Sequence, residues 1–202
     1  MQHLTLLAVL ALAACTPASD KPAISDTETP AASVAAPTPP ASGNSLRADG
    51  WGPLTIGMTL AEVTAALGPD GDPDAVGGPD PESCDEFRPE RAPEGLLVMI
   101  EDGRLSRLSV VDMLALKTGE GLGLGDMAEA VKSAHGAQAQ ATPHKYVEPP
   151  AEYITVWSGG PRADTHVEDE AARGVVYEID GTGKVGAIHV GGPSIQYVEG
   201  CA

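Results

Sequence analysis

The sequence predicts an α+β fold of two tandem repeats, each a helix followed by three strands, with the helices packed on antiparallel sheet behind a disordered tether. The main observation is the motif Ile-Gly-Met-Thr-Leu-Ala-Glu-Val-Thr-Ala-Ala-Leu-Gly at 56–68, which returns in degenerate form at 124–136. Gly57 matches Gly125 and Gly68 matches Gly136, so the offset is constant, as in a duplicated supersecondary unit. A hairpin pattern after each copy completes repeat 1 at 49–118 and repeat 2 at 119–202.

Each copy of the motif predicts a short amphipathic helix. Thr59 and Glu62 have the spacing of a capping box, in which each side chain accepts a hydrogen bond from a free backbone N–H at the helix start. Gly68, followed by a proline, supplies the end of this helix. In the second copy, Asp126 and Glu129 stand at the same capping spacing and predict the start of the second helix.

Strand patterns follow both helices. In the first repeat they cover 83–88, 95–100 and 105–112, and Asp102-Gly103 between the last two is a hairpin turn pair. In the second repeat they cover 153–157, 174–180 and 185–190, with a turn at 181–183. The alternation of the last strand places His189 toward solvent, opposite Ile188 and Val190.

The first residues have the pattern of a signal peptide, at 1–14. Its apolar run of 11 residues from Leu4 to Ala14 is too short to span a bilayer core of about 30 Å. The end of the run, Leu12-Ala13-Ala14-Cys15, resembles the lipobox of bacterial lipoproteins, which implies lipidation (palmitate) of Cys15. One departure from a signal peptide is that no Lys or Arg precedes the run, and a plain secretory signal with a chance Cys stays open as the alternative. By analogy with lipoprotein sorting, Thr16 favours a periplasm-facing lipoprotein of the outer membrane.

Composition separates a tether from the folded part and limits the partners. Residues 15–48 are rich in Pro, Ala, Ser and Thr without apolar periodicity, which is typical of a disordered tether. The net charge of −17 argues against nucleic acid and against an anionic membrane surface as partners, so the lipid alone would hold the chain at the membrane. The acidity serves solubility, or it attracts a basic partner or divalent cations.

Two cysteines remain once Cys15 carries lipid. In an oxidising compartment Cys84 and Cys201 most simply form one disulfide, although a free thiol or an intermolecular bridge stays open. No second Cys or nearby His accompanies either at ligand spacing, so we expect no metal site there. The carboxylates of Asp70, Asp72 and Asp74 are spaced like the start of a calcium loop, but the rest of that pattern is missing and a solvated acidic loop is expected.

These features together resemble known envelope proteins. Two helix-plus-three-strand units that open with Ile-Gly-Met-Thr-Leu-Ala-Glu-Val behind a lipobox resemble small lipoproteins of the small protein A / outer-membrane lipoprotein A type, and also the tandem β-lactamase inhibitory protein fold. The resemblance covers 51–111 and 121–190. It implies helices on one face of an antiparallel sheet and binding of other proteins without catalysis, but it does not carry over a particular partner.

The candidate binding residues gather in the longer connection of the second repeat. His144, Lys145, Tyr146 and Tyr153 bring rings and charge together there, and Trp157 ends the next strand pattern. With aromatic residues at only 3% of the chain, each is informative: Trp and Tyr often anchor interfaces, although they also fill the cores of small domains or cover a sheet edge. His166 with Glu168 offers ligand types for a cation, but a solvated acidic turn is the simpler interpretation.

The sequence contains no motif of catalysis. Gly-x-Ser-x-Gly, His-Glu-x-x-His and a phosphate-binding glycine loop are all missing, so we expect no enzyme and no cofactor. The expectation is a monomeric lipid-anchored protein whose domain binds another envelope protein. The alternatives are an inhibitor of an envelope hydrolase and a domain that binds a cation or a small molecule.

Overall fold

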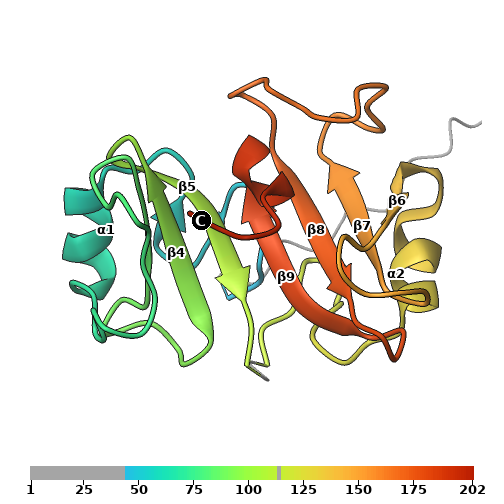
Figure 1. Ribbon diagram of the computed structural model, residues 1–202, viewed down its shortest axis with the longest axis horizontal. Helices are drawn as coiled ribbons and strands as arrows, with labels where there is room; N and C mark the ends of the chain where they lie inside the picture. The colour runs from blue at the N-terminus through green and yellow to red at the C-terminus, as the bar shows by residue number, and fades with distance from the viewer. Residues whose placement is uncertain (1–43, 113–114) are drawn as a thin grey trace, which may run out of the picture. The chain divides into compact units, whose positions relative to one another are not determined.

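The structure is a computed structural model that describes residues 44–112 and 115–202 (Figure 1). The predicted signal peptide, Cys15 and the tether up to residue 43 lie outside the described residues. Residues 44–48, predicted as the end of the tether, belong to the folded domain: Leu46 is buried and its N–H donates to the Lys117 carbonyl at 2.9 Å. Within the described ranges no helix is long and apolar enough to cross a membrane.

The predicted fold class of two helix-plus-three-strand repeats is wrong, because the fold is mostly β. A seven-stranded antiparallel sheet has the order β3-β4-β5-β9-β8-β7-β6, and a separate two-stranded sheet pairs β1 with β2. The described residues contain two α-helices of eight residues each, α1 (Leu60–Leu67) and α2 (Ala128–His135). The strands are β1 (Gly50–Trp51), β2 (Leu54–Thr55), β3 (Cys84–Phe87), β4 (Leu96–Glu101), β5 (Arg104–Val110), β6 (Gln140–Pro143), β7 (Glu152–Trp157), β8 (Gly174–Ile179) and β9 (Val185–Gly191).

Pairing between distant strands makes the two halves of the chain one sheet. β5 from the first half lies antiparallel to β9 from the second, with Leu108 opposite Val190 and Ser109 opposite His189. β6 adds a fourth strand to the second half, where the sequence predicted only a proline-containing connection. Neither the β5–β9 ladder nor β6 has a local signal, which is why the repeat pattern did not indicate a single continuous sheet.

The turn between β4 and β5 and the cap of α1 are formed by residues that are close together in the sequence. Asp102 and Gly103 join β4 to β5 with positive φ angles of 48° and 75°, as a two-residue hairpin turn requires. At the start of α1, the Glu62 N–H donates to Thr59 Oγ1 at 3.3 Å and the Thr59 N–H donates to Glu62 Oε2 at 2.8 Å. The predicted capping box of α1 is therefore present.

The predicted cap of α2 by Asp126 and Glu129 is wrong. The N-cap of this helix is Met127, which has no side-chain capping bond. The Asp126 carboxylate accepts the Gly123 N–H at 2.8 Å instead, so it closes the turn that enters the helix. The carboxylate of a short acidic side chain at this place can accept a hydrogen bond from a backbone N–H of the helix or of the glycine-rich turn before it. Here it accepts from the turn.

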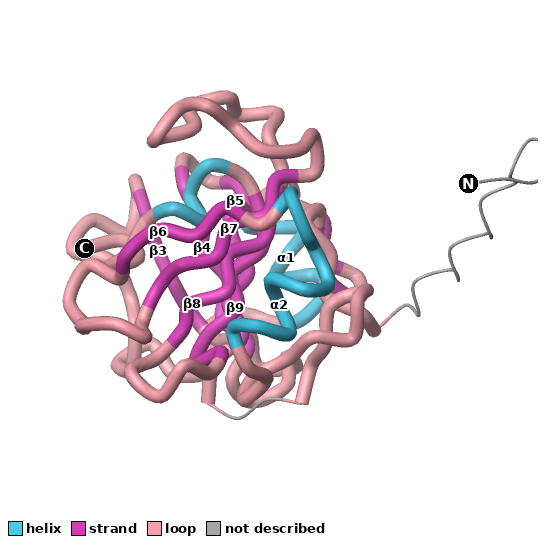
Figure 2. The backbone as a smooth tube through the Cα atoms, turned by 90° about the vertical axis from the view of Figure 1, so that its right-hand side faces the viewer, coloured by secondary structure: helices cyan, strands magenta, loops and turns pink. Residues whose placement is uncertain are grey.

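The two faces of the sheet carry different layers. Both helices lie on one face, where Val63 and Val131 join the large apolar cluster formed by the inward residues of the strands (Figure 2). The other face holds a smaller cluster of Trp157, Val167, Ala172, Val176 and Ile195. This second layer consists of the β7–β8 connection (158–173) and the segment after β9, which contains the 3-10 turn η2 (Pro193–Gln196).

Candidate functional site

A pocket of about 450 Å³ lies on the sheet face opposite the helices. Thr155, Val176, Glu178 and His189 line it from the sheet, and 162–166 line it from the connection that arches above β7 and β8 in Figure 1. The segment 195–198 after β9 supplies a further wall. The volume falls in the range of about 300 to 1,000 Å³ that ligand sites usually have.

The structure brings four of the five predicted binding residues to this pocket. Lys145, Tyr153 and Trp157 line it. His144 stacks on Tyr153, with 4.6 Å between the ring centroids. Tyr146 is not among the lining residues; its side chain is exposed, and the Lys145 Nζ lies 5.0 Å from its ring centroid. Trp157 is only 3% exposed, so its ring belongs to the smaller apolar cluster as well as to the pocket.

Glu178 lies between two histidines. His144 Nε2 is 3.2 Å from Glu178 Oε1, and His189 Nε2 is 3.6 Å from Glu178 Oε2. The Nδ1 atom of His144 accepts the backbone N–H groups of Tyr146 and Val147 at 3.1 and 3.2 Å. The proton of the neutral ring is therefore on Nε2, which donates to the carboxylate.

The second histidine is oriented in a similar way. Ser109 Oγ lies 2.8 Å from His189 Nδ1. When the hydroxyl donates to Nδ1, the ring proton lies on Nε2 and faces Glu178. The carboxylate thus faces imidazole nitrogens from two different parts of the chain, with His144 at hydrogen-bond distance and His189 slightly beyond it.

These contacts move the protonation equilibria of both groups. The nearby His189 is the largest influence on Glu178 and lowers the pKa of its carboxyl below the ordinary value; burial acts against it and the bond from His144 adds to it. Burial lowers the pKa of His189 because the imidazolium loses hydration, and nearby Arg107 adds to this against the opposing effect of Glu178. Near neutral pH, the pocket therefore holds an ionised Glu178 beside an uncharged His189.

The predicted exposure of His189 is wrong. Its side chain is largely covered, and so are those of Arg107 and Ser109, which point from β5 to the same face. Alternation correctly separates the two faces of a strand, but it does not say whether the second face meets solvent. Here the segment after β9 covers it.

Ser109, His189 and Glu178 have the residue types of a serine–histidine–acid triad. Ser109 is 3% exposed and is not among the residues that line the pocket, so its oxygen does not face a ligand. Its contact with Nδ1 orients the ring of His189 toward Glu178. Ser109 and His189 therefore position the carboxylate of Glu178.

Metal ligation does not fit this group of side chains. Among residues 44–112 and 115–202, no set of three or more His, Cys, Asp or Glu is arranged to hold a metal ion. At the pocket the reason is visible in His144, because the backbone bonds at Nδ1 leave the proton on Nε2 and no lone pair there for a cation. In the acidic loop the Asp70 carboxylate accepts the Asp72 N–H at 3.0 Å and closes a local turn.

Two glutamines hold the β7–β8 connection across the pocket. The Gln140 side chain donates to the Arg162 carbonyl at 2.7 Å and accepts the Arg162 N–H at 2.8 Å. Gln196 binds Val167 in the same reciprocal way, with both distances 2.9 Å. Each glutamine side chain thus pairs with the backbone N–H and carbonyl of one residue in the connection, as a neighbouring strand would. His166, interpreted from the sequence as part of a solvated turn, is brought to the pocket by this attachment.

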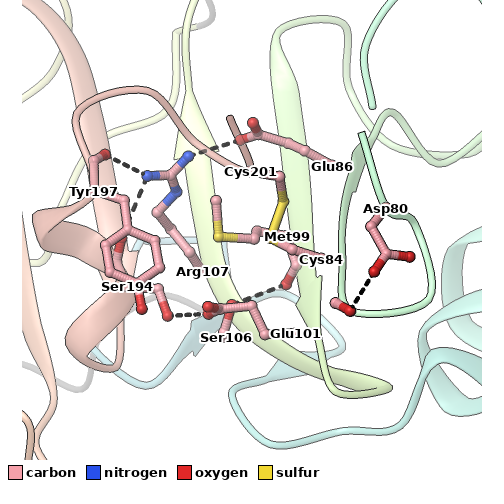
Figure 3. The surroundings of a disulfide bond; sticks show 11 residues. Asp80, Cys84, Glu86, Met99, Glu101, Ser106, Arg107, Ser194, Tyr197 and Cys201 are labelled. Atoms are coloured by element: carbon pink, nitrogen blue, oxygen red, sulfur yellow. Dashed lines mark hydrogen bonds and ion pairs between the residues drawn. A yellow bond between two sulfur atoms is a disulfide. The ribbon is translucent and has the colours of Figure 1, made fainter. Parts of the chain in front are cut away.

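The C-terminal wall of the pocket is fastened to the first half of the chain (Figure 3). The predicted disulfide is present, with 2.05 Å between the sulfur atoms of Cys84 and Cys201. Arg107 donates to the carbonyls of Tyr197 at 2.9 Å and Ser194 at 3.3 Å, and its Nη2 is 2.9 Å from Glu86 Oε1. We call these contacts the C-terminal clamp.

Glu178, His189, Gln140 and Gln196 were not predicted as site residues. A weak signal existed for the first two, because the predicted hairpin of 174–180 with 185–190 places both on its outward face. In the structure Val176 lies opposite His189, and Glu178 lies opposite Ala187. Glu178 and His189 are therefore diagonal neighbours on adjacent strands. The glutamines had no such signal, since their partners lie in a connection without periodicity.

The pKa shifts predict that acidification destabilises the fold. Because the pKa of His189 is lowered in the folded state, the unfolded chain binds its proton first, and stability is lost as the pH falls below the ordinary value of 6.5. The lowered pKa of Glu178 acts in the same direction below 4.5. Urea denaturation at about pH 7.5 and about pH 5.5 is expected to show a smaller loss for His189→Gln than for the native protein. The exposed His166→Gln control should behave like the native protein, and equal losses in all three would contradict the assignment.

Comparison with protein-family models, with curated proteins and with solved structures found no match to the chain. The resemblance to envelope lipoproteins and to the β-lactamase inhibitory fold therefore stays a prediction.

Proposed function

We propose that this chain is a non-catalytic binding protein of the bacterial envelope and that the pocket is where it engages another protein. In this proposal lipid on Cys15 holds it at the periplasmic face of the outer membrane. The pattern of the first residues supports the anchor, and the described domain supports the binding role.

The exposed apolar residues around the pocket carry the proposal. Six large hydrophobic side chains are exposed in the described residues, and four of them, Tyr146, Val147, Tyr197 and Val198, belong to two segments at the pocket. The segments touch, because Lys145 Nζ lies 3.4 Å from Glu199 Oε1. Exposed apolar groups gathered at one place are typical of protein interaction sites.

The pocket gives such a surface a place for an anchoring side chain. Hot-spot residues of interfaces usually fill a pocket surrounded by contacts that exclude water. Tyr153 and Trp157 line this pocket, and the two glutamine attachments hold the connection above it in place. A partner side chain can therefore be received with little reorganisation, which lowers the entropic cost of binding.

Filling the pocket is expected to abolish capture of the partner. The lipidated full chain is crosslinked in intact cells beside Thr155→Phe, which adds a ring at the pocket, and Ser133→Phe, which adds the same ring on exposed α2 at the opposite face. Native protein and Ser133→Phe should recover one common partner, and Thr155→Phe at least about tenfold less. Equal recovery by both variants, or no recovery by the native chain, would reject the proposal. Cys15→Ser should leave the membrane fraction, which tests the anchor separately.

A second candidate function is binding of a small molecule, and the pocket volume of about 450 Å³ favours it. Native mass spectrometry of protein isolated from envelopes is the direct measurement. A bound small molecule would appear as a mass increment in the native protein and in Ser133→Phe that is missing from Thr155→Phe.

A further inference from the structure

We infer that the pocket receives the cationic end of a basic side chain of the partner, paired with the carboxylate of Glu178. This inference rests on the proposed function, because it names the chemistry of the same site. It follows from the charges around the pocket, from the unused acceptor capacity of Glu178 and from the aromatic walls.

Glu178 can accept more hydrogen bonds than it receives. A carboxylate has roughly four lone-pair directions; His144 takes one at 3.2 Å, and His189 faces another at 3.6 Å. The side chain is 33% exposed and lines the pocket, so the remaining directions are open to a group that enters. Because both imidazoles are held at their Nδ1 atoms, the carboxylate is fixed before the partner arrives.

The basic residues at the pocket already face acids. Lys145 lies 3.4 Å from Glu199, and an Arg162 nitrogen lies 3.9 Å from Asp169. Glu178 has only imidazole neighbours, and in the described residues Asp164, which also lines the pocket, has no ion pair. The lining has two acids and two bases, but because each base faces an acid outside the lining, Asp164 and Glu178 are left without a lysine or arginine partner in the described part of the chain, which fits a cation and repels an anion.

The walls and rim of the pocket fit a side chain of a peptide better than a simple amine. Tyr153 and Tyr197 line the pocket, and their rings can attract a cation within about 6 Å. The exposed Tyr197 and Val198 offer apolar contacts to the rest of a peptide segment, which a simple amine does not use.

Matched peptides test the charge requirement. Three probes differ at one residue, Ac-Gly-Tyr-Xaa-Gly-amide with Xaa as arginine, citrulline or glutamate; citrulline keeps the shape of arginine without its charge. Saturation-transfer NMR with the lipidated chain in detergent micelles gives the dissociation constants. The arginine peptide is expected to bind about tenfold or more tightly than the citrulline peptide, since only the guanidinium adds the attraction of opposite charges to its hydrogen bonds with the carboxylate.

Variants locate the effect at Glu178. Glu178→Gln should remove the preference for arginine over citrulline, whereas Glu129→Gln, an exposed acid on α2, should keep it. Should Glu178→Gln fail to fold, the comparison of the three peptides on the native chain still decides. Equal binding of arginine and citrulline, strongest binding of glutamate, no binding of any peptide, or an unchanged preference in folded Glu178→Gln would each overturn the inference. If Thr155→Phe still abolishes capture of the partner in that case, the proposed function stands and only the charge assignment fails.

Discussion

Replacing Cys84 and Cys201 by serine is expected to lower the free energy of unfolding by about 4 to 5 kcal/mol. The bond joins residues separated by 117 positions, so in the unfolded chain it closes a very long loop and removes much of the conformational freedom of that state. Urea denaturation of the native protein, of the native protein with reductant and of the double variant measures the effect. Reductant should move the native transition to that of the variant and leave the variant unchanged.

The same variant is expected to loosen the pocket. Cys201 lies three residues after Val198, the last residue of the segment 195–198 that forms the C-terminal wall of the pocket. Hydrogen exchange at the amides of Ile195 and Tyr197 should therefore accelerate, while exchange in α2, on the opposite face of the sheet (Figure 2), should change only with global stability. An unchanged free energy of unfolding would show that the unfolded chain does not gain the expected freedom.

Replacing Arg107 by methionine is expected to cost about 3 to 5 kcal/mol. The side chain is 3% exposed, and its loss leaves the Glu86 carboxylate and two carbonyls of the segment after β9 without their donor. Methionine keeps most of the volume, so the lost interactions, more than a cavity, set the effect. The measurement is urea denaturation at neutral pH.

Arg88 supplies the matched control for this experiment. It forms an ion pair with Asp112 at 3.2 Å on the surface, with the Arg88 side chain 32% and the Asp112 side chain 61% exposed. Exposed pairs contribute about 0 to 1 kcal/mol, so Arg88→Met should be nearly neutral. An equal effect of both replacements would mean that burial does not strengthen the Arg107 contacts. Combining Arg107→Met with the cysteine variant should cost less than the sum, because both hold the same segment.

The C-terminal clamp and the pocket share the segment 195–198. Tyr197 lines the pocket with its side chain and accepts from Arg107 with its carbonyl. A variant that releases the clamp is therefore expected to weaken binding at the pocket as well as stability. The peptide measurements must for that reason be made on variants whose folding has been verified.

Local signals determined the elements that depend on a few neighbouring residues. Thr59 and Glu62 determined the start of α1, and Asp102-Gly103 determined the turn between β4 and β5, because the interacting groups lie within three positions of each other. The disulfide was predictable from the count of cysteines. The predicted cap of α2 was wrong by one residue: the N-cap is Met127, and the Asp126 carboxylate accepts a backbone N–H of the preceding turn instead.

Only the tertiary structure decided the fold class, the exposure of the second sheet face and the site. The sequence determined where six of the nine strands in the described residues lie, β3 to β5 and β7 to β9, since alternation and apolar runs are properties of a single strand. It did not determine that β5 pairs with β9, that β6 joins the sheet or that the segment after β9 covers it. Ser109 and His189 are 80 positions apart, and their contact exists only after that pairing. The pocket around Glu178 is likewise made by a connection and a chain end whose partners are far away in sequence, where periodicity carries no information.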